Sequence, residues 1–164
     1  MTQNCCKRVA IFPGTFDPFT RGHHSVVMRA LDLFDEVVIA VGVNFTKKPM
    51  LTAEERVAML EALYADEPRV RVTSYSGLTV DVAQACGAKY MLRGVRSTID
   101  FEYEKAIADV NREISGLETI LLFTEPCYAH ISSSVVRELV SYGRDVSSFL
   151  PEGVLLPERI YNKE

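Results

Sequence analysis

Five short apolar runs, rich in β-branched residues, recur along the chain, and segments with helical period separate them. The runs cover residues 9–12, 37–43, 70–72, 90–92 and 120–123. Their apolar residues are mostly continuous rather than alternating with polar ones, which is typical of strands covered by helices on both faces. The pattern therefore predicts an α/β protein with a doubly wound, five-stranded parallel sheet.

Two of the intervening segments carry apolar residues at helical spacing along one face. The first set is Val26, Val27, Ala30, Leu31 and Phe34, and the second is Ile99, Tyr103, Ala106, Ile107, Val110 and Ile114. Such stripes predict amphipathic helices. Apolar positions alone do not distinguish a stripe that packs on the sheet from one at a subunit interface.

Helix boundaries are marked by capping residues. Thr52 and Glu55 have the spacing of a capping box, in which each side chain bonds the backbone N–H of the other residue. Gly87, Gly116 and Gly143 stand where three helices are expected to end. These signals support the alternation of strands and helices.

The length of 164 residues and the hydrophobic share of 48% fit one domain with its own core, which needs neither disulfide nor metal to fold. No repeat, low-complexity tract or linker divides the chain, so we expect a single domain over residues 1–164. Residues 1–7 and 158–164 are expected at its periphery. The segment 157–164 fits either a short helix or a frayed tail.

Charge and patterning exclude several partners. Charged residues make up 24% of the chain, and its net charge is −4 at pH 7, so nucleic acid and anionic membranes are not expected partners. The longest apolar run, residues 37–43, is far shorter than the roughly 20 residues that span a bilayer. The first eight residues lack the apolar segment of a secretory signal, and we expect a cytoplasmic protein.

The four cysteines show no pattern of metal ligation. Cys5, Cys6, Cys86 and Cys127 include no C-x-x-C pair and have no histidine at ligand spacing. In a reducing cytosol they are expected to be free thiols, and no protein metal site is expected.

The segment after the first strand has the composition of an anion-binding loop. Ligands of parallel α/β sheets bind beyond the carboxyl ends of the strands. Residues 13–24 contain two prolines and two glycines and lead into a helix that begins near His23. Gly14 and Gly22 allow a close approach of backbone to ligand, and the helix start offers free N–H groups to a phosphate. The loop matches neither the dinucleotide-binding nor the P-loop pattern, and alone it would also fit an ordinary tight turn.

Three other strand ends add polar and basic residues at the same edge. Lys47 and Lys48 follow the second strand, Arg93 and Arg96 follow the fourth, and a serine triplet opens the helix after the fifth. Each feature alone fits a solvated surface or an ordinary helix cap. Their coincidence in an acidic protein predicts a polyphosphate pocket.

At these residues the sequence resembles the phosphopantetheine adenylyltransferase family from about residue 8 to residue 154. Two motifs, in residues 14–23 and 131–137, are shared with a wider superfamily of nucleotidyltransferases. The segments 47–56, 92–96 and 100–104 are characteristic of the pantetheine family. Arg21, where asparagine is expected, is a small departure. The resemblance implies a Rossmann-like nucleotidylyltransferase fold.

The resemblance also implies a reaction and a set of residues. The phosphate of 4′-phosphopantetheine attacks the α-phosphorus of ATP, which yields dephospho-coenzyme A and pyrophosphate in coenzyme A biosynthesis. The implied catalytic residues are His23 and Lys47, and the implied acceptor-binding residues are Thr15, Lys47, Thr79 and Arg93. The implied ATP-binding residues are Thr15, Phe16, His23, Gly94, Val95, Arg96, Glu104, Tyr128, Ala129, His130, Ile131, Ser132, Ser133 and Ser134.

The family further implies a Mg²⁺ ion held mainly by the ATP phosphates, and a homohexamer. Two other functions stay open at this point. One is an adenylyl- or cytidylyltransferase that uses another phosphate acceptor, which a screen of acceptors with detection of pyrophosphate would distinguish. The other is a nucleotide sensor that binds without catalysis, although such a protein could dispense with His23 and Lys47.

Overall fold

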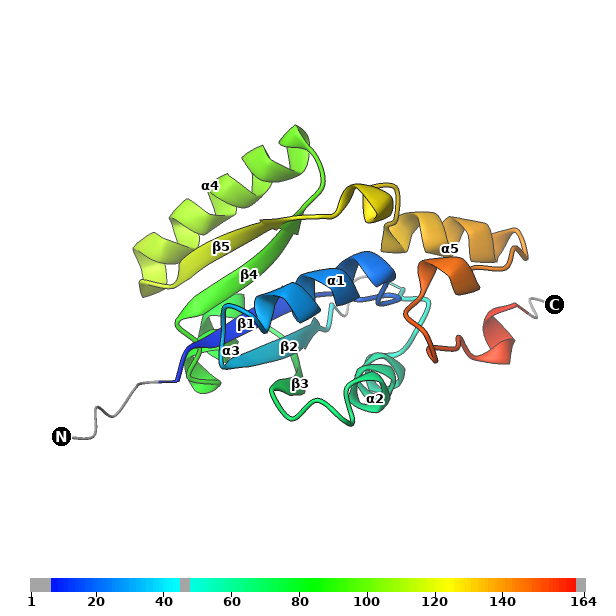
Figure 1. Cartoon of the computed structure of the whole chain (residues 1–164), viewed down its shortest axis with the longest axis horizontal. Coiled ribbons are helices and arrows are strands. Elements are labelled where there is room, and N and C mark those ends of the chain that lie inside the picture. Colours follow the sequence, from blue (N-terminus) through cyan, green and yellow to red (C-terminus); the bar gives the residue numbers. More distant parts are fainter. Residues whose placement is uncertain (1–6, 45–47, 162–164) are drawn as a thin grey trace.

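Five parallel strands form one sheet in the computed structural model, which describes residues 7–44 and 48–161. The strands are β1 (Val9–Gly14), β2 (Glu36–Gly42), β3 (Val70–Tyr75), β4 (Tyr90–Val95) and β5 (Glu118–Phe123). Their order is β3-β2-β1-β4-β5, so the chain runs outward from β1 in one direction and then returns to build the other half (Figure 1). This arrangement confirms the predicted α/β fold class.

Helices cover both faces of the sheet, and the two cores follow from the alternation of side chains along the strands. The helices are α1 (Arg21–Ala30), α2 (Ala53–Leu63), α3 (Thr79–Ala85), α4 (Thr98–Ser115) and α5 (Ser133–Ser141). On one face α1 and α2 pack over Phe12, Ile39 and their neighbours. On the other face α3 packs over Ile11 and Val38. Successive strand residues therefore enter opposite cores, as the continuous apolar runs predict.

The helix boundaries agree with the capping signals in the sequence. The Thr52 hydroxyl accepts a hydrogen bond from the Glu55 backbone N–H at 3.2 Å, and the Glu55 carboxylate accepts one from the Thr52 N–H at 2.8 Å. Gly116 ends α4 with a φ of 71°, a left-handed conformation that glycine adopts without steric cost. Within the described residues, no helix has both the length and the apolar character required to cross a membrane.

The apolar stripe of α4 lies outside both cores. The helix forms as predicted, but Ile99, Tyr103, Ile107, Val110 and Ile114 are exposed, with Ile99 at 80%. Glu104 is the buried residue of the helix. The helix contacts β4 and β5, while these five stripe residues stay exposed in the single chain.

The C-terminal segment lies beyond the carboxyl ends of the strands (Figure 1), and it contributes to a third apolar cluster. It includes the short 3-10 helices Ser147–Phe149 and Glu158–Ile160. Leu150 and Ile160 pack with Leu51 and with Val136 of α5. For the tail, the structure shows a short 3-10 helix at Glu158–Ile160, and residues 162–164 lie outside the described residues. Ile160 is only 6% exposed, so this part of the expected periphery contributes to a core.

Candidate active site

Two adjoining cavities open where the carboxyl ends of the central strands meet the following loops. The first cavity has a volume of about 480 Å³ and is bounded by the segments after β1, β4 and β5. It brings together many of the residues implied by the resemblance, namely Thr15, Phe16, His23, Arg93, Gly94, Arg96, Glu104, Ile131, Ser132, Ser133 and Ser134. Residues from distant parts of the sequence thus converge at one sheet edge.

The second cavity has a volume of about 340 Å³ and lies between β2, β4, α3 and α4. Thr79 lines it, and the Thr79 hydroxyl is 2.9 Å from the hydroxyl of Tyr75. Pro13, Gly14, Thr15, Arg93 and Glu104 line both cavities. These shared residues place the boundary of the two cavities at the end of β1.

The loop after β1 folds around a buried phenylalanine. Phe16 has a φ of 51°, which is unusual for a residue with a side chain. Its ring lies over Gly14, where an added Cβ would come within 2.7 Å of the ring carbons. Gly14 is therefore required by this close approach. Because Phe16 is only 4% exposed, it is chiefly the loop backbone that can face a ligand.

The His23 ring is fixed by the start of α1. The backbone N–H of Thr20 donates to His23 Nδ1 at 3.1 Å, and the Thr20 hydroxyl lies 3.0 Å from the same nitrogen. The ring also packs edge-on against Phe16, with centroids 5.2 Å apart. The motif T-x-G-H is thus a capping box in which histidine occupies the place of glutamate.

This environment sets the protonation of His23. Since Nδ1 accepts the hydrogen bond, the proton of the neutral ring is on Nε2. Desolvation, followed by the positive charges of Arg96 and Arg93, lowers the pKa of His23 to about 4. At neutral pH His23 is therefore an uncharged hydrogen-bond donor in the first cavity.

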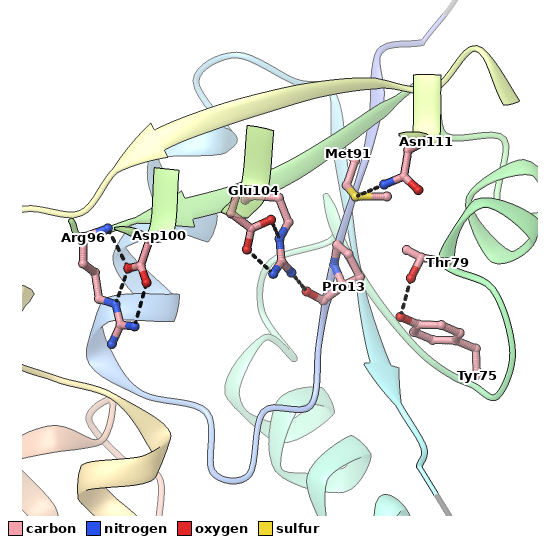
Figure 2. A network of polar contacts seen from close by, with 9 residues as sticks. Pro13, Tyr75, Thr79, Met91, Arg96, Asp100, Glu104 and Asn111 are labelled. Atoms are coloured by element: carbon pink, nitrogen blue, oxygen red, sulfur yellow. Dashed lines mark hydrogen bonds and ion pairs between the residues drawn. The ribbon is translucent and has the colours of Figure 1, made fainter. Parts of the chain in front are cut away.

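Arg93 is held at the boundary of the two cavities by α4 and β1. Its Nε donates to Glu104 Oε2 at 2.8 Å and its Nη2 to Oε1 at 2.5 Å, while Nη1 donates to the Pro13 carbonyl at 2.6 Å. Glu104 and Pro13, the two partners of this guanidinium, are labelled in Figure 2. Arg93 thus engages both oxygens of Glu104. The contact of Glu104 with a nucleotide stays a prediction.

Arg96 lies at the rim of the first cavity. Its Nε donates to Asp100 Oδ2 at 3.0 Å, and its backbone N–H donates to the same oxygen at 3.2 Å (Figure 2). Ser97 caps α4 through the Asp100 N–H. The Arg96 side chain is 39% exposed, so its guanidinium remains accessible to an anion.

The N-terminus of α5 forms the opposite wall of the first cavity. Ser132 caps the helix by accepting from the Val135 N–H, and Ser133 Oγ donates to the Pro18 carbonyl at 2.8 Å. Arg137 Nη1 donates to the Asp17 carbonyl at 2.8 Å. These bonds fasten the serine triplet to the loop after β1. A helix start of this kind favours a bound phosphate.

Some implied residues do not join this arrangement. Lys47 lies outside the described residues. Val95 is buried at 1% exposure, and Tyr128, Ala129 and His130 do not line either cavity. In the described part of the chain, no group of three or more histidine, cysteine, aspartate or glutamate residues could hold a metal ion.

Three residues at the site received no role from the sequence. Arg137 contacts the loop after β1 as described above. The Asp17 carboxylate accepts from the backbone N–H groups of Met50 and Leu51, each at 2.8 Å. Arg56, on α2, donates to backbone carbonyls of the same region. The motifs include all three residues, but no residue pattern indicates contacts with backbone groups that lie far away in the sequence.

Comparison with known proteins finds a matching family model and similar curated proteins. Residues 11–139 match the family model described as Cytidylyltransferase-like. The phosphopantetheine adenylyltransferase of Phocaeicola vulgatus is 58% identical over 147 residues, which are 90% of this chain and 97% of that protein. Proteins of the same name from Bacteroides thetaiotaomicron and Lachnoclostridium phytofermentans are 54% and 43% identical. They align with 90% and 95% of this chain and over 97% and 95% of their own lengths.

Solved structures share the fold. Two crystal structures of a bifunctional NMN adenylyltransferase/ADP ribose pyrophosphatase from Francisella tularensis match with TM-scores of 0.69 and 0.66, each at 15% identity over 88% of this chain. The chain spans 45% and 44% of those longer chains. At this identity the likeness concerns the nucleotidylyltransferase fold alone.

Proposed function

The chain belongs to the phosphopantetheine adenylyltransferase family, and we propose from this premise how its two cavities divide the reaction between them. The enzyme is a nucleotidyltransferase of coenzyme A biosynthesis. It transfers the adenylyl group of ATP to the phosphate of 4′-phosphopantetheine and releases pyrophosphate and dephospho-coenzyme A. The reaction requires two phosphate-bearing substrates to meet at one point.

ATP binds in the first cavity. The N-terminus of α5 offers backbone N–H groups to the triphosphate, and Arg96 at the rim adds a positive charge. Val26, Gly94 and Ile131 provide an apolar part of the lining that suits the adenine ring. A Cβ at Gly94 would come within 3.2 Å of the Val26 side chain, so a side chain there would crowd this part of the cavity.

4′-Phosphopantetheine binds in the second cavity, with its phosphate at the shared boundary beside Thr15 and Arg93. Its extended amide-containing arm follows the wall formed by Tyr75, Thr79, Met91, Tyr103 and Asn111. The Asn111 side-chain amide donates to the Met91 sulfur at 3.6 Å (Figure 2). Because a thioether is a weak acceptor, this amide can exchange that contact for a carbonyl of the substrate.

The observation that carries the proposal is the meeting of the two cavities at Arg93 and Thr15, with neutral His23 on the first-cavity side. The acceptor phosphate is already ionised, so its attack on the α-phosphorus needs positioning and charge neutralisation more than a general base. His23 Nε2–H donates to an oxygen of the α-phosphate as charge develops there. Lys47 has the role that the resemblance implies, next to the attacking phosphate.

Mg²⁺ would be carried mainly by the ATP phosphates, and when bound it would supply positive charge to balance that of the leaving pyrophosphate. Asp17 and Asp100 line the first cavity, but their carboxylates bond Met50, Leu51 and Arg96 instead, which suits an ion carried by the substrate. The part of the exposed apolar stripe of α4 that lines neither cavity, Ile99 and Val110, supports a homohexamer in which other copies cover it. The cytoplasmic location stays a prediction.

An acceptor screen tests the proposal. The purified protein is incubated with ATP, Mg²⁺ and one acceptor at a time, and pyrophosphate release is measured. We expect turnover with 4′-phosphopantetheine and at least 10²-fold slower turnover with nicotinate mononucleotide or glycerol phosphate, whose shapes leave the second cavity unfilled. Equal rates would favour another acceptor, and ATP binding without any pyrophosphate release would favour a sensor.

A further inference from the structure

Arg56 is a buried cation whose hydrogen-bond partners are backbone carbonyls. It lies in the first two turns of α2 and is 3% exposed. Nη1 donates to the carbonyls of Thr15 at 2.6 Å and Gly42 at 3.1 Å, and Nε donates to the carbonyl of Thr52 at 3.2 Å. Among the described residues it forms no ion pair. One guanidinium thus joins three segments of the chain.

Burial of a cation without a paired carboxylate is costly. At Arg56 burial lowers the pKa of the guanidinium, while the negative charges of Asp17 and Glu54 act in the opposite direction. Three charge-assisted hydrogen bonds compensate part of this cost. An apolar residue at the same place would avoid the desolvation of a charge. We therefore attribute the presence of an arginine at position 56 to its hydrogen bonds with these carbonyls.

Two of these carbonyls belong to residues that line the second cavity, Thr15 and Gly42. Thr15 precedes Phe16, whose left-handed φ of 51° needs support from its surroundings. Gly42 ends β2 beside the loop after β1, since a Cβ there would make ordinary van der Waals contact, at 3.7 Å, with both the Gly14 carbonyl and the Tyr75 hydroxyl. Arg56 therefore links the loop after β1 to the end of β2 behind this wall of the cavity.

We propose that Arg56 is a positioning residue for the acceptor substrate. By holding the carbonyls of Thr15 and Gly42, it fixes the spacing between these two residues in the wall of the second cavity. Arg56 lines neither cavity, so it acts through these two residues and not by contact with substrate. The proposal rests on the proposed function, because it takes the second cavity as the acceptor site. Gly42 lies only in the second cavity, so the effect should fall on the acceptor more than on ATP.

Replacement by lysine separates geometry from charge. Arg56→Lys keeps the positive charge but lacks the planar fork that reaches several carbonyls from fixed directions. We expect kcat/KM for 4′-phosphopantetheine to fall by roughly 10–100-fold, as misplacement of a substrate by a fraction of an ångström can do. The Kd for ATP, measured by calorimetry, should change less than about twofold.

A matched substitution controls for general loss of an arginine. Arg69 also donates to a backbone carbonyl, that of Leu31 at 3.1 Å, but lines neither cavity. Arg69→Lys should leave both kinetic constants unchanged. Thermal unfolding of each variant is recorded, and kinetics are measured well below the lower midpoint. If Arg56→Lys does not fold, Arg56→Gln, which keeps a neutral N–H donor, takes its place.

Three outcomes would overturn the proposal. They are unchanged acceptor kinetics in Arg56→Lys, equal losses for acceptor and ATP, or failure of both variants to fold, which would make Arg56 a residue of stability alone. The proposed function is tested separately by the wild-type protein. Lack of wild-type turnover with 4′-phosphopantetheine would contradict the function, whereas the ratio of variant to wild type bears only on Arg56.

Discussion

Arg93 and Glu104 form a bidentate ion pair at the boundary of the two cavities, with Nε–Oε2 and Nη2–Oε1 distances of 2.8 and 2.5 Å. Glu104 is the buried residue of a helix whose apolar stripe is exposed. The buried position of α4 is thus occupied by a charged residue that is paired with Arg93. This pair sets the orientation of the guanidinium that lines both cavities.

Glu104→Gln should disturb Arg93 without removing it. Glutamine accepts through one oxygen, and its NH₂ group faces a guanidinium donor, so one of the two charge-assisted bonds is lost. We expect a loss of about 1.5–3 kcal/mol in kcat/KM for the acceptor, a factor of roughly 10–150. Steady-state kinetics with varied 4′-phosphopantetheine measure it.

Glu102→Gln on the same helix is the control for Glu104→Gln. Glu102 is exposed and lines neither cavity, so its kinetics should match the wild type. A defect in Glu104→Gln confined to ATP binding would instead support the direct nucleotide contact that the resemblance implies.

His23→Ala should remove a hydrogen bond made mainly in the transition state. We expect kcat to fall by about 10²–10³-fold, the usual effect of losing one such donor, while the Kd for ATP changes much less. The control is His24→Ala, because His24 pairs with the Tyr64 hydroxyl at 2.8 Å and does not line the cavities. That variant can lose stability but should retain kcat. A near-normal kcat in His23→Ala would remove His23 from the chemistry.

The protonation of His23 gives a prediction about pH. Its pKa is lowered to about 4 in the folded protein, from an ordinary value of 6.5. Between these values the unfolded chain binds more protons than the folded one, so the free energy of unfolding rises with pH in this window. The contribution of neutral His23 to the free energy of unfolding is complete above pH 6.5. It is lost as pH falls toward 4.

Nuclear magnetic resonance of labelled histidine tests this directly. The His23 signals should show the neutral Nε2–H form from pH 8 down to about pH 5. The stability difference between wild type and His23→Gln should be constant above pH 6.5 and should shift against the wild type below it. Titration of His23 near 6.5 would contradict the neutral donor.

Much of this fold could be predicted from local pattern. The run 37–43 is apolar throughout, and the side chains from Val37 to Val41 are all fully buried, as a central strand between two helical layers requires. The stripe of α4 shows where pattern fails. Ile107 and Val110 have the same spacing as the core residues of α1, yet they are exposed, because periodicity records a shared face and not what covers it.

The site could be predicted only in part for a related reason. His23 and Ser132 follow strand ends, and parallel topology brings such ends together, so their convergence follows from sequence. The apolar pattern places Arg93 after a strand over residues 90–92, but β4 continues to Val95, so Arg93 lies within the last part of the strand. The contacts of Arg56 and Asp17 do not follow from sequence. They reach backbone groups 14 to 41 residues away in one case and 33 to 34 in the other, and a backbone carbonyl or N–H has no residue type to recognise.

The division of the pocket between Lys47 and Arg96 supplies the last prediction. The resemblance places Lys47 with the acceptor, and Arg96 lies at the rim of the first cavity. Lys47→Ala should therefore weaken 4′-phosphopantetheine use and slow the chemistry with ATP binding nearly intact, and Arg96→Ala should do the reverse. Each lost contact should cost about 1.5–3 kcal/mol, a factor of roughly 10–150.

Calorimetric titration of each variant with ATP and with 4′-phosphopantetheine distinguishes this division from a simpler alternative. If both residues were solvated surface charges, each change would stay below about 1 kcal/mol. Arg96 is paired with Asp100 at 3.0 Å. Asp100→Asn therefore serves as a control that keeps the Arg96 guanidinium but removes the charge of its partner. Two variants that lose both ligands equally would show that the cavities do not separate the substrates, because a charge confined to one cavity cannot weaken both to the same extent.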